Sequence, residues 1–508
     1  MVWRIDDPEG NESGKIVWET VPYTRGQGLD LGCGANKVWP HAIGVDNYAA
    51  MQQFGTAMRP DVASDCTRLQ VFGSASMDWV YSSHLLEHIE DTAGALKEWW
   101  RVIKPGGFLI LYLPHKDFYP HVGTEGANPD HKHDFLPQDI VDVMKDVGAW
   151  DLVRNEDRSE GREYSFFQVY KKRTDGKRIY SHTAPKPEKR AAVLRYGAFG
   201  DAIQASSILP GLKAQGYHIT FYCTPRTQDV LKHDPHIDAW YVQDVDQVPN
   251  LRLGEFWDWE RKKFDKFINL SESVEGTLLT LPGRPNHVWP ANMRRKHLDA
   301  NYFEFVHDLA DVPMPPQPKF YATDEEKVWA KKEAARLGTP LIMYSLSGSS
   351  VHKVWPWQDR LFARILLQHK EAHIVTVGDE LSQMLEVGWE DEPRVHCMSG
   401  KYTIRQSMSL LAECAMVIGP ETGMLNAAAH MDVPKIVLLS HSSANNLTKH
   451  WVNTAAVEPQ NTACYPCHKM HYSFEHCHRD DATGTALCAT NIDLENVWDA
   501  FAGFMNHA

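Results

Sequence analysis

The sequence has no apolar run long enough to cross a membrane and no excess of positive charge. Its first residues, MVWRIDDPEGNESGK, lack the apolar core of a signal peptide, so we expect a soluble, cytoplasmic protein without a transmembrane anchor. Lys and Arg total 52 against 66 Asp and Glu, which gives a net charge of −14. Because duplex-DNA binders neutralise phosphates with Lys and Arg, this balance argues against a nucleic-acid partner, while a local basic cleft for a nucleotide is compatible with it.

Cysteine is also scarce, and its distribution is uneven. Of the nine cysteines, five are scattered through core-like or strand-end segments, and four crowd into residues 464–488. A secreted disulfide framework would spread its pairs over the whole chain, which this pattern does not do. The sequence has neither a repeat at solenoid spacing nor a low-complexity tract.

The length and composition predict a globular protein of two or three domains. A chain of 508 residues exceeds one hydrophobic core, and 43% hydrophobic with 23% charged residues is ordinary for folded domains. The polar segment KKRTDGKRIYSHTAPKPEK has two prolines and no apolar periodicity, which is typical of a linker, and PMPPQP marks a second boundary. We predict a first domain over 1–174, a linker over 175–189, and two further domains over 190–318 and 319–508.

Alternating strands and helices are indicated in the first domain. Residues 27–34, QGLDLGCG, predict a strand that ends in an acid and a glycine turn, and residues 43–46, IGVD, predict a second strand ending in an acid. Glycines let the backbone approach a ligand, and an acid placed here can accept both ribose hydroxyl protons. Further strands over 77–81 and 108–113 alternate with helical segments, which predicts a parallel sheet with 166–170 as its closing strand.

These motifs resemble the class I methyltransferases that use S-adenosylmethionine. LDLGCG, GVD, SSHLLEHIED and RVIKPGGFLIL stand in the order of that family. The resemblance implies a Rossmann-like domain with S-adenosylmethionine as its cofactor. By the same resemblance, Asp30, Gly32 and Gly34 would contact the methionine moiety of the cofactor. Asp46 would contact the ribose, and Asp65 with Cys66 would contact the adenine.

The residues after the fourth predicted strand bear on the methyl acceptor. SSHLLEH stands where amino-directed DNA methyltransferases carry a DPPY-like tetrad, so methylation of a base amine is disfavoured. For a hydroxyl acceptor, His84, His88, His131 and His133 are candidate general bases, since a base with a pKa near 7 suits proton removal. Alternatively, the first two histidines only line the cofactor pocket and the last two belong to a surface loop. A domain that binds the cofactor without catalysis is a further alternative.

The second half of the chain is organised around AAVLRYGAFGD at residues 191–201. An apolar strand leads into two glycines and Asp201, and residues 202–213 carry apolar positions at helical spacing. This order opens an α/β sheet, and such sheets bind ligands at the carboxyl ends of their strands. Asp201 is therefore a candidate catalytic base of a sugar transfer; the alternative is an ordinary helix N-cap.

This half resembles glycosyltransferase family 9, the lipopolysaccharide heptosyltransferases. The segments that carry the resemblance are RYGAFGDAIQASSILPGLK, SGSSVHKVWP and VIGPETGMLNAAAHMDVPKIVLLS, in family order over 191–460. It implies a GT-B pair of Rossmann-like domains, a nucleotide-diphosphate sugar as donor, and Asp201 as the base of an inverting transfer. The positions that match the family's diphosphate and nucleoside contacts are Ser349, Ser350, Lys353, Glu380, Tyr402, Glu421, Thr422 and Gly423.

The chemistry of these residues agrees with the roles that the resemblance implies. Backbone amides of residues 422–424 at a helix start form an anion site, and Lys353 would offset charge on the departing nucleoside diphosphate, so a metal is not demanded. The family commonly has aspartate where Glu421 stands and histidine where Asn426 stands. These departures leave the donor sugar open.

The cysteine-rich tail carries a metal-like spacing. Cys464, Cys467, Cys477 and Cys488 form C-x2-C-x9-C-x10-C, with histidines interleaved. A tetrahedral zinc site needs four thiolate or imidazole ligands, so these cysteines are candidate ligands of a structural zinc. Disulfides and plain reduced thiols are the alternatives.

Together these patterns predict an α/β protein with a bifunctional, carbohydrate-modifying activity. A methyltransferase module would be fused to an inverting glycosyltransferase, and the methyl group would go to a glycan hydroxyl. The alternatives are an enzyme that adds a sugar to a modified nucleic-acid base, and a structural or virion protein that keeps both folds without turnover.

Overall fold

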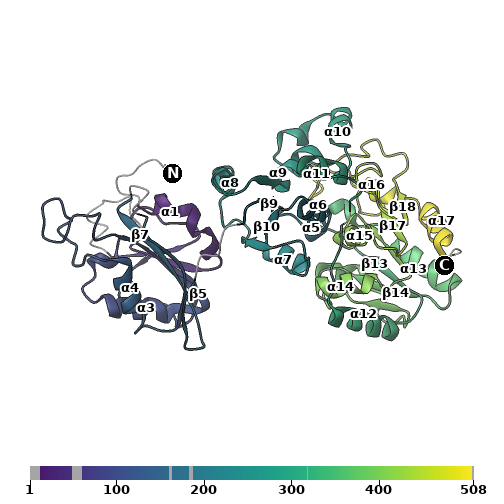
Figure 1. The fold of residues 1–508 in the computed structure, drawn as a ribbon. Coiled ribbons are helices and arrows are strands. Elements are labelled where there is room, and N and C mark those ends of the chain that lie inside the picture. Colours follow the sequence, from purple (N-terminus) through teal and green to yellow (C-terminus); the bar gives the residue numbers. More distant parts are fainter. Residues whose placement is uncertain (1–11, 48–59, 159–162, 182–186, 317, 506–508) are drawn as a thin grey trace. The chain divides into compact units, whose positions relative to one another are not determined.

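The computed structural model describes residues 12–47, 60–158, 163–181, 187–316 and 318–505. The chain forms two compact units. The first contains Met1–Lys186 and Gln243–Lys262, and the second contains Pro187–Val242 and Lys263–Ala508 (Figure 1). In the part of the chain that the structure describes, we find no helix whose length and apolar character would suit a membrane crossing.

The first unit is built on one eight-stranded sheet in the order β3-β2-β1-β4-β5-β7-β6-β8. Five neighbouring strands, β3, β2, β1, β4 and β5, run parallel to one another. Strand β7 lies between β5 and β6 and is antiparallel to both. The strands are β1 (Gly28–Leu31), β2 (Ile43–Asp46), β3 (Val62–Ala63), β4 (Met77–Ser83), β5 (Ile103–Pro114), β6 (Trp150–Glu156), β7 (Ser165–Lys172) and β8 (Arg178–Tyr180).

Two details of this sheet differ from the expectations above. The strand expected to close the sheet, 166–170, lies inside it as part of β7, because β6 pairs with its other edge. Residues 178–180 of the segment predicted as a linker form β8, which pairs in parallel with β6. Three exposed residues with no apolar periodicity gave no signal of a strand.

Helices of the first unit cover the sheet with apolar faces at helical spacing. In α3 (Thr92–Val102) the buried residues include Leu96, Trp99 and Trp100, and the Asp91 carboxylate caps the helix by accepting from the Gly94 amide at 2.8 Å. The other helical segments are α1 (Glu12–Thr20), η1 (Val21–Tyr23), η2 (Leu86–His88), α4 (Pro137–Met144), η4 (Asn250–Arg252) and α8 (Leu253–Arg261).

Segment 243–262 belongs to the first unit although the chain has already entered the second. The rings of Phe256 in α8 and Trp18 in α1 lie 5.7 Å apart. The Gln247 side chain donates to the Val21 carbonyl at 2.7 Å, and the Gly26 amide donates to the Asp244 carboxylate at 2.8 Å. The segment therefore completes one side of the first unit.

The second unit contains two parallel sheets, one in each of two lobes. The first lobe has the order β11-β10-β9-β12 and the second has β15-β14-β13-β16-β17-β18. The strands are β9 (Arg190–Leu194), β10 (His218–Cys223), β11 (Ala239–Val242), β12 (Lys266–Asn269), β13 (Leu341–Ser345), β14 (His373–Val377), β15 (Val395–Cys397), β16 (Met416–Pro420), β17 (Lys435–Leu438) and β18 (Thr454–Val457).

Both faces of the second lobe's sheet are covered by helices. Successive side chains of β13 point to opposite faces, so Ile342 and Tyr344 join one apolar cluster, and Leu341 and Met343 join the other. Figure 1 shows α13 and α17 on one side of this sheet and α14 and α15 on the other. The helices are α5 (Phe199–Ser206), α6 (Leu209–Ala214), α7 (Pro225–Leu231), α9 (Leu270–Thr277), α10 (Ala291–Leu298), α11 (Tyr302–Ala310), α12 (Asp324–Leu337), α13 (Gln358–Gln368), α14 (Ile404–Leu411), α15 (Gly423–Ala428), α16 (Leu487–Thr490) and α17 (Leu494–Met505), with η5 (Pro285–Val288), η6 (Val351–Lys353) and η7 (Leu381–Leu385).

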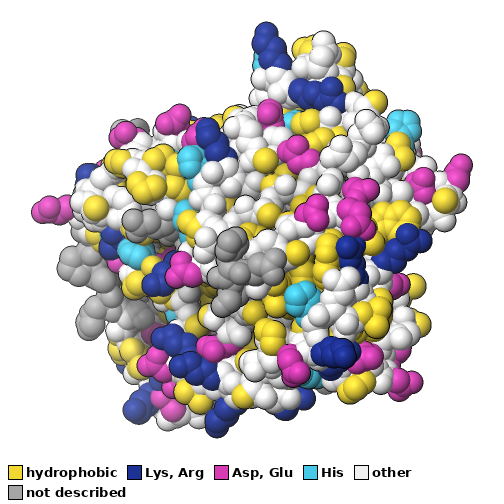
Figure 2. Space-filling model, turned by 90° about the vertical axis from the view of Figure 1, so that its right-hand side faces the viewer, with side chains coloured by type: hydrophobic (Ala, Val, Ile, Leu, Met, Phe, Trp, Pro, Cys, Tyr) yellow, Lys and Arg dark blue, Asp and Glu magenta, His cyan; other side chains and the backbone are white. Residues whose placement is uncertain are grey.

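These sheets confirm the predicted fold class, a Rossmann-like first unit followed by a GT-B pair of Rossmann-like lobes. One apolar cluster runs through both lobes of the second unit, from Val193 in β9 to Val417 in β16. On the face drawn in Figure 2, Lys and Arg side chains are interspersed with Asp and Glu.

Candidate active sites

The glycine turn of the first unit follows β1, where the sequence placed it. Gly32 and Gly34 have φ angles of +69° and +52°, a region that glycine adopts without strain. Asp30 is buried and accepts a hydrogen bond from the Val38 amide at 2.6 Å. Burial raises the pKa of the Asp30 carboxyl to about 7, against the effect of that hydrogen bond.

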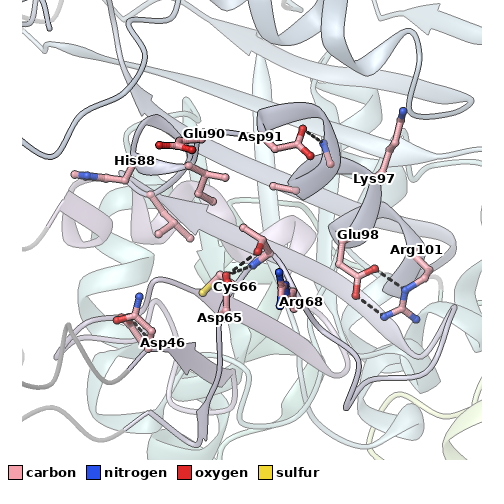
Figure 3. Close-up of a pocket in the computed structure, with 16 residues that line it drawn as sticks. Asp46, Asp65, Cys66, Arg68, His88, Glu90, Asp91, Lys97, Glu98 and Arg101 are labelled. Atoms are coloured by element: carbon pink, nitrogen blue, oxygen red, sulfur yellow. Dashed lines mark hydrogen bonds and ion pairs between the residues drawn. The ribbon is translucent and has the colours of Figure 1, made fainter.

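A cavity of about 840 Å³ opens beside this turn (Figure 3). Among its lining residues are Asp46, Asp65, Cys66 and His88, four of the predicted site residues. The Asp46 carboxylate accepts from the Gly34 amide at 2.9 Å, which joins the glycine turn to the cavity wall. The Asp65 carboxylate accepts from the Thr67 amide and hydroxyl, both at 2.8 Å.

His84 and His88 flank a residue that the sequence reasoning missed, Glu87. Glu87 is fully buried in η2, and burial raises the pKa of its carboxyl to about 8. His84 has φ +48° and its Nε2 lies 2.9 Å from the Ser165 hydroxyl, while burial lowers the pKa of its imidazole to about 3. Residue type alone gave no reason to expect a buried acid between two histidines.

In the second unit, Asp201 lies in the first turn of α5 and forms an ion pair that the sequence did not reveal. The Arg195 guanidinium lies 3.0 Å from the Asp201 carboxylate and 2.6 Å from the carboxylate of Glu275 in α9. Arg195 follows the apolar β9 directly and is 1% exposed. In the sequence, the signal that could have indicated this ion pair is a basic residue directly after an apolar strand.

Lys353 and the Glu421 turn belong to the second lobe, and the Asp201 carboxylate of the first lobe is close enough to act electrostatically on Lys353. The Lys353 ammonium donates to the Glu421 carbonyl at 2.6 Å. Burial lowers the pKa of Lys353, and the carboxylates of Glu421 and Asp201 oppose this shift. A Cβ added at Gly200 would lie 2.6 Å from the Cα of Gly423, so α5 and α15 approach at backbone distance.

The Glu421 carboxylate is held by backbone amides of the loop that follows β17. It accepts from the amides of Ser440, His441 and Ser442 at 2.8, 3.3 and 3.2 Å. Burial raises the pKa of Glu421, but the His441 imidazole, Lys353 and the Ser440 amide outweigh it, so the net shift is downward. Glu421 therefore fixes the loop after β17 against the turn that precedes α15.

The remaining predicted nucleotide-sugar residues fall on the second lobe in different settings. Ser349 is exposed, whereas the Ser350 hydroxyl is occupied by the backbone carbonyl of His471 at 2.7 Å and by the His352 ring at 2.7 Å. Glu380 is exposed before η7, and the Tyr402 hydroxyl bonds the Glu333 carboxylate. Thr422 Oγ1 lies 2.9 Å from the Ser345 hydroxyl, immediately before Gly423 opens α15.

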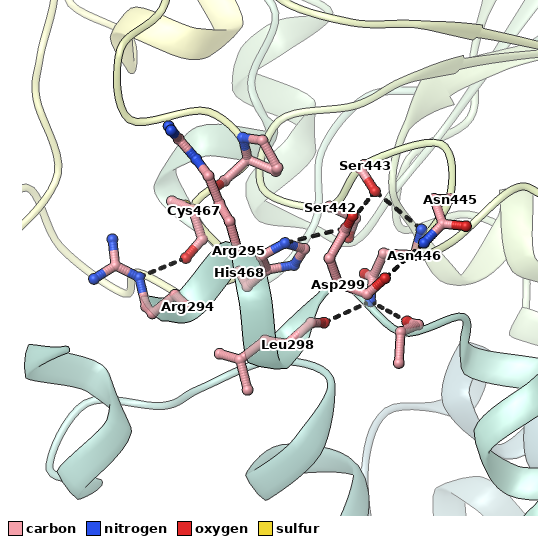
Figure 4. Close-up of polar contacts among 12 residues, drawn as sticks. Arg294, Arg295, Leu298, Asp299, Ser442, Ser443, Asn445, Asn446, Cys467 and His468 are labelled. Atoms are coloured by element: carbon pink, nitrogen blue, oxygen red, sulfur yellow. Dashed lines mark hydrogen bonds and ion pairs between the residues drawn. The ribbon is translucent and has the colours of Figure 1, made fainter. Parts of the chain in front are cut away.

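The four tail cysteines are free thiols that lie near one another. Burial raises the pKa of Cys467 to about 12 and of Cys477 to about 11, and neighbouring tail thiols add to both shifts. The tail loop rests on α10 of the first lobe, where the Arg294 guanidinium donates to the Cys467 carbonyl at 2.9 Å (Figure 4). Among the described residues, however, the group whose ligand atoms lie within 4.8 Å of one another is Glu87, His88 and His131, not the cysteines.

Family models match both units of the chain. A model described as Methyltransferase domain matches residues 29–111, and one described as Glycosyltransferase family 9 (heptosyltransferase) matches residues 260–478. Two transferase domains share this chain. The methyltransferase match includes the glycine turn and His88, and the glycosyltransferase match includes Lys353 and Glu421 but begins after Asp201.

Individual relatives resemble one domain or the other. Phosphoethanolamine N-methyltransferase 1 of Arabidopsis thaliana is 26% identical over 189 residues, which is 33% of this chain and 36% of that protein. The glycosyl transferase family 9 structure from Veillonella parvula covers 64% of this chain and all of its own, at 16% identity and a TM-score of 0.46. A SAM-dependent methyltransferase from Aquifex aeolicus covers 33% of this chain and 94% of its own, at 14% identity and a TM-score of 0.25.

Proposed function

We propose that this chain is a bifunctional carbohydrate-modifying enzyme. Its glycosyltransferase domain would transfer a sugar from a nucleotide-diphosphate donor with inversion, and its methyltransferase domain would methylate a glycan hydroxyl. The observation that supports the first activity is that Asp201 acts electrostatically on Lys353, which bonds to the Glu421 turn, where α5 and α15 of the two lobes approach each other.

For sugar transfer, the first lobe would supply a negative charge at the acceptor hydroxyl and the second lobe a positive charge at the departing diphosphate. The Asp201 carboxylate, oriented by the Arg195 guanidinium, would take the proton of the acceptor hydroxyl as its oxygen attacks the anomeric carbon. The bond from that carbon to the diphosphate breaks in the same displacement, which inverts the centre. Lys353 would offset the negative charge that develops on the departing diphosphate.

For methyl transfer, the residues around the cavity fit S-adenosylmethionine. Asp46, Asp65 and Cys66 line it, and the Gly34 amide of the glycine turn hydrogen-bonds to Asp46 at its wall. We assign Asp30, Gly32 and Gly34 to the methionine moiety, Asp46 to the ribose, and Asp65 with Cys66 to the adenine. The bound cofactor supplies an electrophilic methyl group on a sulfonium. His84 and His88 would lie on the acceptor side, and the acceptor hydroxyl would release its proton to water as its oxygen bonds to the methyl group.

The tail cysteines would hold a structural zinc ion. Four thiols are a donor set that zinc prefers, neighbouring tail thiols contribute to the raised pKa values of Cys467 and Cys477, and the Arg294 guanidinium holds the loop through the Cys467 carbonyl. Metal analysis of the purified chain, before and after replacement of Cys464 and Cys467 by serine, would measure this. Loss of one equivalent is the expected result, and unchanged metal content would contradict it.

Because the two domains share one chain, we propose that both act on one glycan, with sugar transfer first. Methyl transfer would be measured on glycosylated and unglycosylated acceptor with the full chain. Faster methylation of the glycosylated acceptor is expected, and equal rates on both would argue against coupling. Native mass spectrometry with a panel of nucleotide sugars would identify the donor, and absence of binding to any of them would contradict the sugar-transfer proposal itself.

A further inference from the structure

Three histidine nitrogens surround one buried carboxylate oxygen in the methyltransferase domain. Glu87 Oε1 lies 3.8 Å from His84 Nδ1, 4.0 Å from His88 Nε2 and 3.9 Å from His131 Nε2. Glu87 is 0% exposed, and neither of its carboxylate oxygens has a hydrogen-bond partner among the described residues. A buried acid without partners is costly unless a proton or a cation neutralises it.

The fold brings these residues together from two separate segments. Glu87 and His88 belong to η2 after β4, and His131 comes from the segment between β5 and α4. The backbone amides of Lys132 and His133 donate to the Glu87 carbonyl at 2.8 and 3.2 Å, which ties the two segments. The cluster is thus a product of the backbone arrangement and does not depend on side-chain placement alone.

Further contacts orient the rings, as they do around metal ligands. His84 turns its Nδ1 to Glu87 while its Nε2 lies 2.9 Å from the Ser165 hydroxyl. The His88 imidazole hydrogen-bonds with the backbone of Asp130, and the His131 ring packs edge-on to it with centroids 4.7 Å apart. Second contacts of this kind fix the ring and tautomer of a ligating histidine. His84 also has a left-handed backbone, a conformation that is often concentrated at functional sites.

The donor set suits a divalent transition metal. One ligand atom from each of Glu87, His88 and His131 lies within 4.8 Å of the others, so a cation about 2.1 Å from each needs only a small contraction. Two imidazoles with one carboxylate and open positions bind Zn²⁺ or Fe²⁺ in proteins.

We propose that Glu87, His88 and His131 bind a divalent transition-metal cation, with His84 as a further nitrogen beside the same carboxylate oxygen. His88 also lines the cofactor cavity, so the cation would lie at the wall of that cavity (Figure 3). A bound cation lowers the pKa of a hydroxyl that coordinates it, which is what methylation of a hydroxyl requires. This use rests on the proposed function, whereas the binding of the cation does not.

The test is a titration of the metal-free full-length chain with Co²⁺, followed by its absorption spectrum. Nitrogen and oxygen ligands give visible ligand-field bands without the thiolate charge-transfer bands that the tail cysteines would add. We expect Glu87→Gln and His131→Gln to weaken this thiolate-free component at least about tenfold, since even outer contacts of a metal site are worth 10–100-fold. His133→Gln is the matched control, because this histidine lies in the same segment but outside the ligand group.

Binding of S-adenosylmethionine to each variant shows whether the domain is folded. Unchanged Co²⁺ binding by the folded Glu87 and His131 variants would overturn the proposal. If these variants do not fold, the unmutated chain decides: a thiolate-free component in its Co²⁺ spectrum supports the site, and the absence of that component overturns it. Co²⁺ binding without methyl transfer would contradict the proposed function and leave the metal site standing.

Discussion

The guanidinium of Arg195 bridges the carboxylates of Asp201, at 3.0 Å, and Glu275, at 2.6 Å. Arg195 is 1% exposed, so its planar fork is fixed and holds Asp201 in one orientation at the lobe contact. A base that must meet an acceptor hydroxyl in a defined geometry gains from such a partner.

This arrangement predicts different losses for the two members of the pair. Asp201→Asn should lower sugar transfer about 10²- to 10⁴-fold, which is the usual contribution of a general base. Arg195→Lys should lower kcat less than Asp201→Asn does and leave the donor KM unchanged, because the Asp201 carboxylate remains but loses the planar guanidinium that orients it. Steady-state kinetics would measure both, with Asp311→Asn, an exposed acid of the same lobe, as control. Near-normal transfer by Asp201→Asn would remove it as the base.

The buried ammonium of Lys353 predicts an alkaline limit to sugar transfer. Its pKa is lowered by burial, so the charged form is lost as pH rises through a value below the usual 10.5 of lysine. Sugar transfer should therefore fall on the alkaline side earlier than an exposed lysine would allow. Lys353→Met should cost about 10²- to 10³-fold in kcat, as loss of an electrostatic donor does. Any transfer left in Lys353→Arg should lack the alkaline fall, because arginine stays charged; an unchanged pH profile would contradict the role of Lys353.

The close approach of α5 and α15 predicts that a single methyl group is not tolerated there. In Gly200→Ala the new Cβ would meet the Gly423 backbone at 2.6 Å, which a side-chain rotation cannot relieve. We expect a loss of about 1–3 kcal/mol in the free energy of unfolding and a parallel loss of sugar transfer. Gly276→Ala in α9 is the matched control, since its Cβ meets nothing within 4 Å and should be neutral or stabilising. Denaturant unfolding would compare them, and equal stabilities would refute the steric argument.

The raised pKa of Asp30 predicts pH-dependent binding of S-adenosylmethionine. Burial raises this pKa to about 7, so the free domain carries a protonated carboxyl below that pH. If the carboxylate receives the cationic methionine amine, affinity should rise with pH and level off above about 7, changing by up to about tenfold per unit below it. Calorimetry in buffers of different ionisation enthalpy would detect the released proton. The same slope in Asp30→Asn would show that another group is responsible.

The sequence predicted the elements that follow local patterns. Apolar runs such as residues 108–113 and 191–194 became buried strands, and the glycines after β1 took the positive φ angles that their turn needs. Each of these features is determined within about ten residues of chain.

Features that depend on distant segments were not predictable. Arg195 pairs with Glu275 across 80 positions, and the Glu87 cluster needs His131 from another loop. Segment 243–262 has ordinary amphipathic character, and nothing local to it indicates that α8 packs on α1. In these cases the tertiary topology, and not the local periodicity of the sequence, determines which residues come into contact.

The excursion of residues 243–262 also bears on how the protein is made. A ribosome must synthesise the chain through Lys262 before the first unit has all of its parts, by which time three of the four strands of the next lobe, β9, β10 and β11, have been synthesised. Cutting the chain at one position therefore does not separate the two units. A fragment that stops near residue 186 leaves Trp18 without its ring contact to Phe256 and the Val21 carbonyl without its hydrogen bond from Gln247. Expression of the methyltransferase by itself would call for a graft of that helix onto the shortened chain.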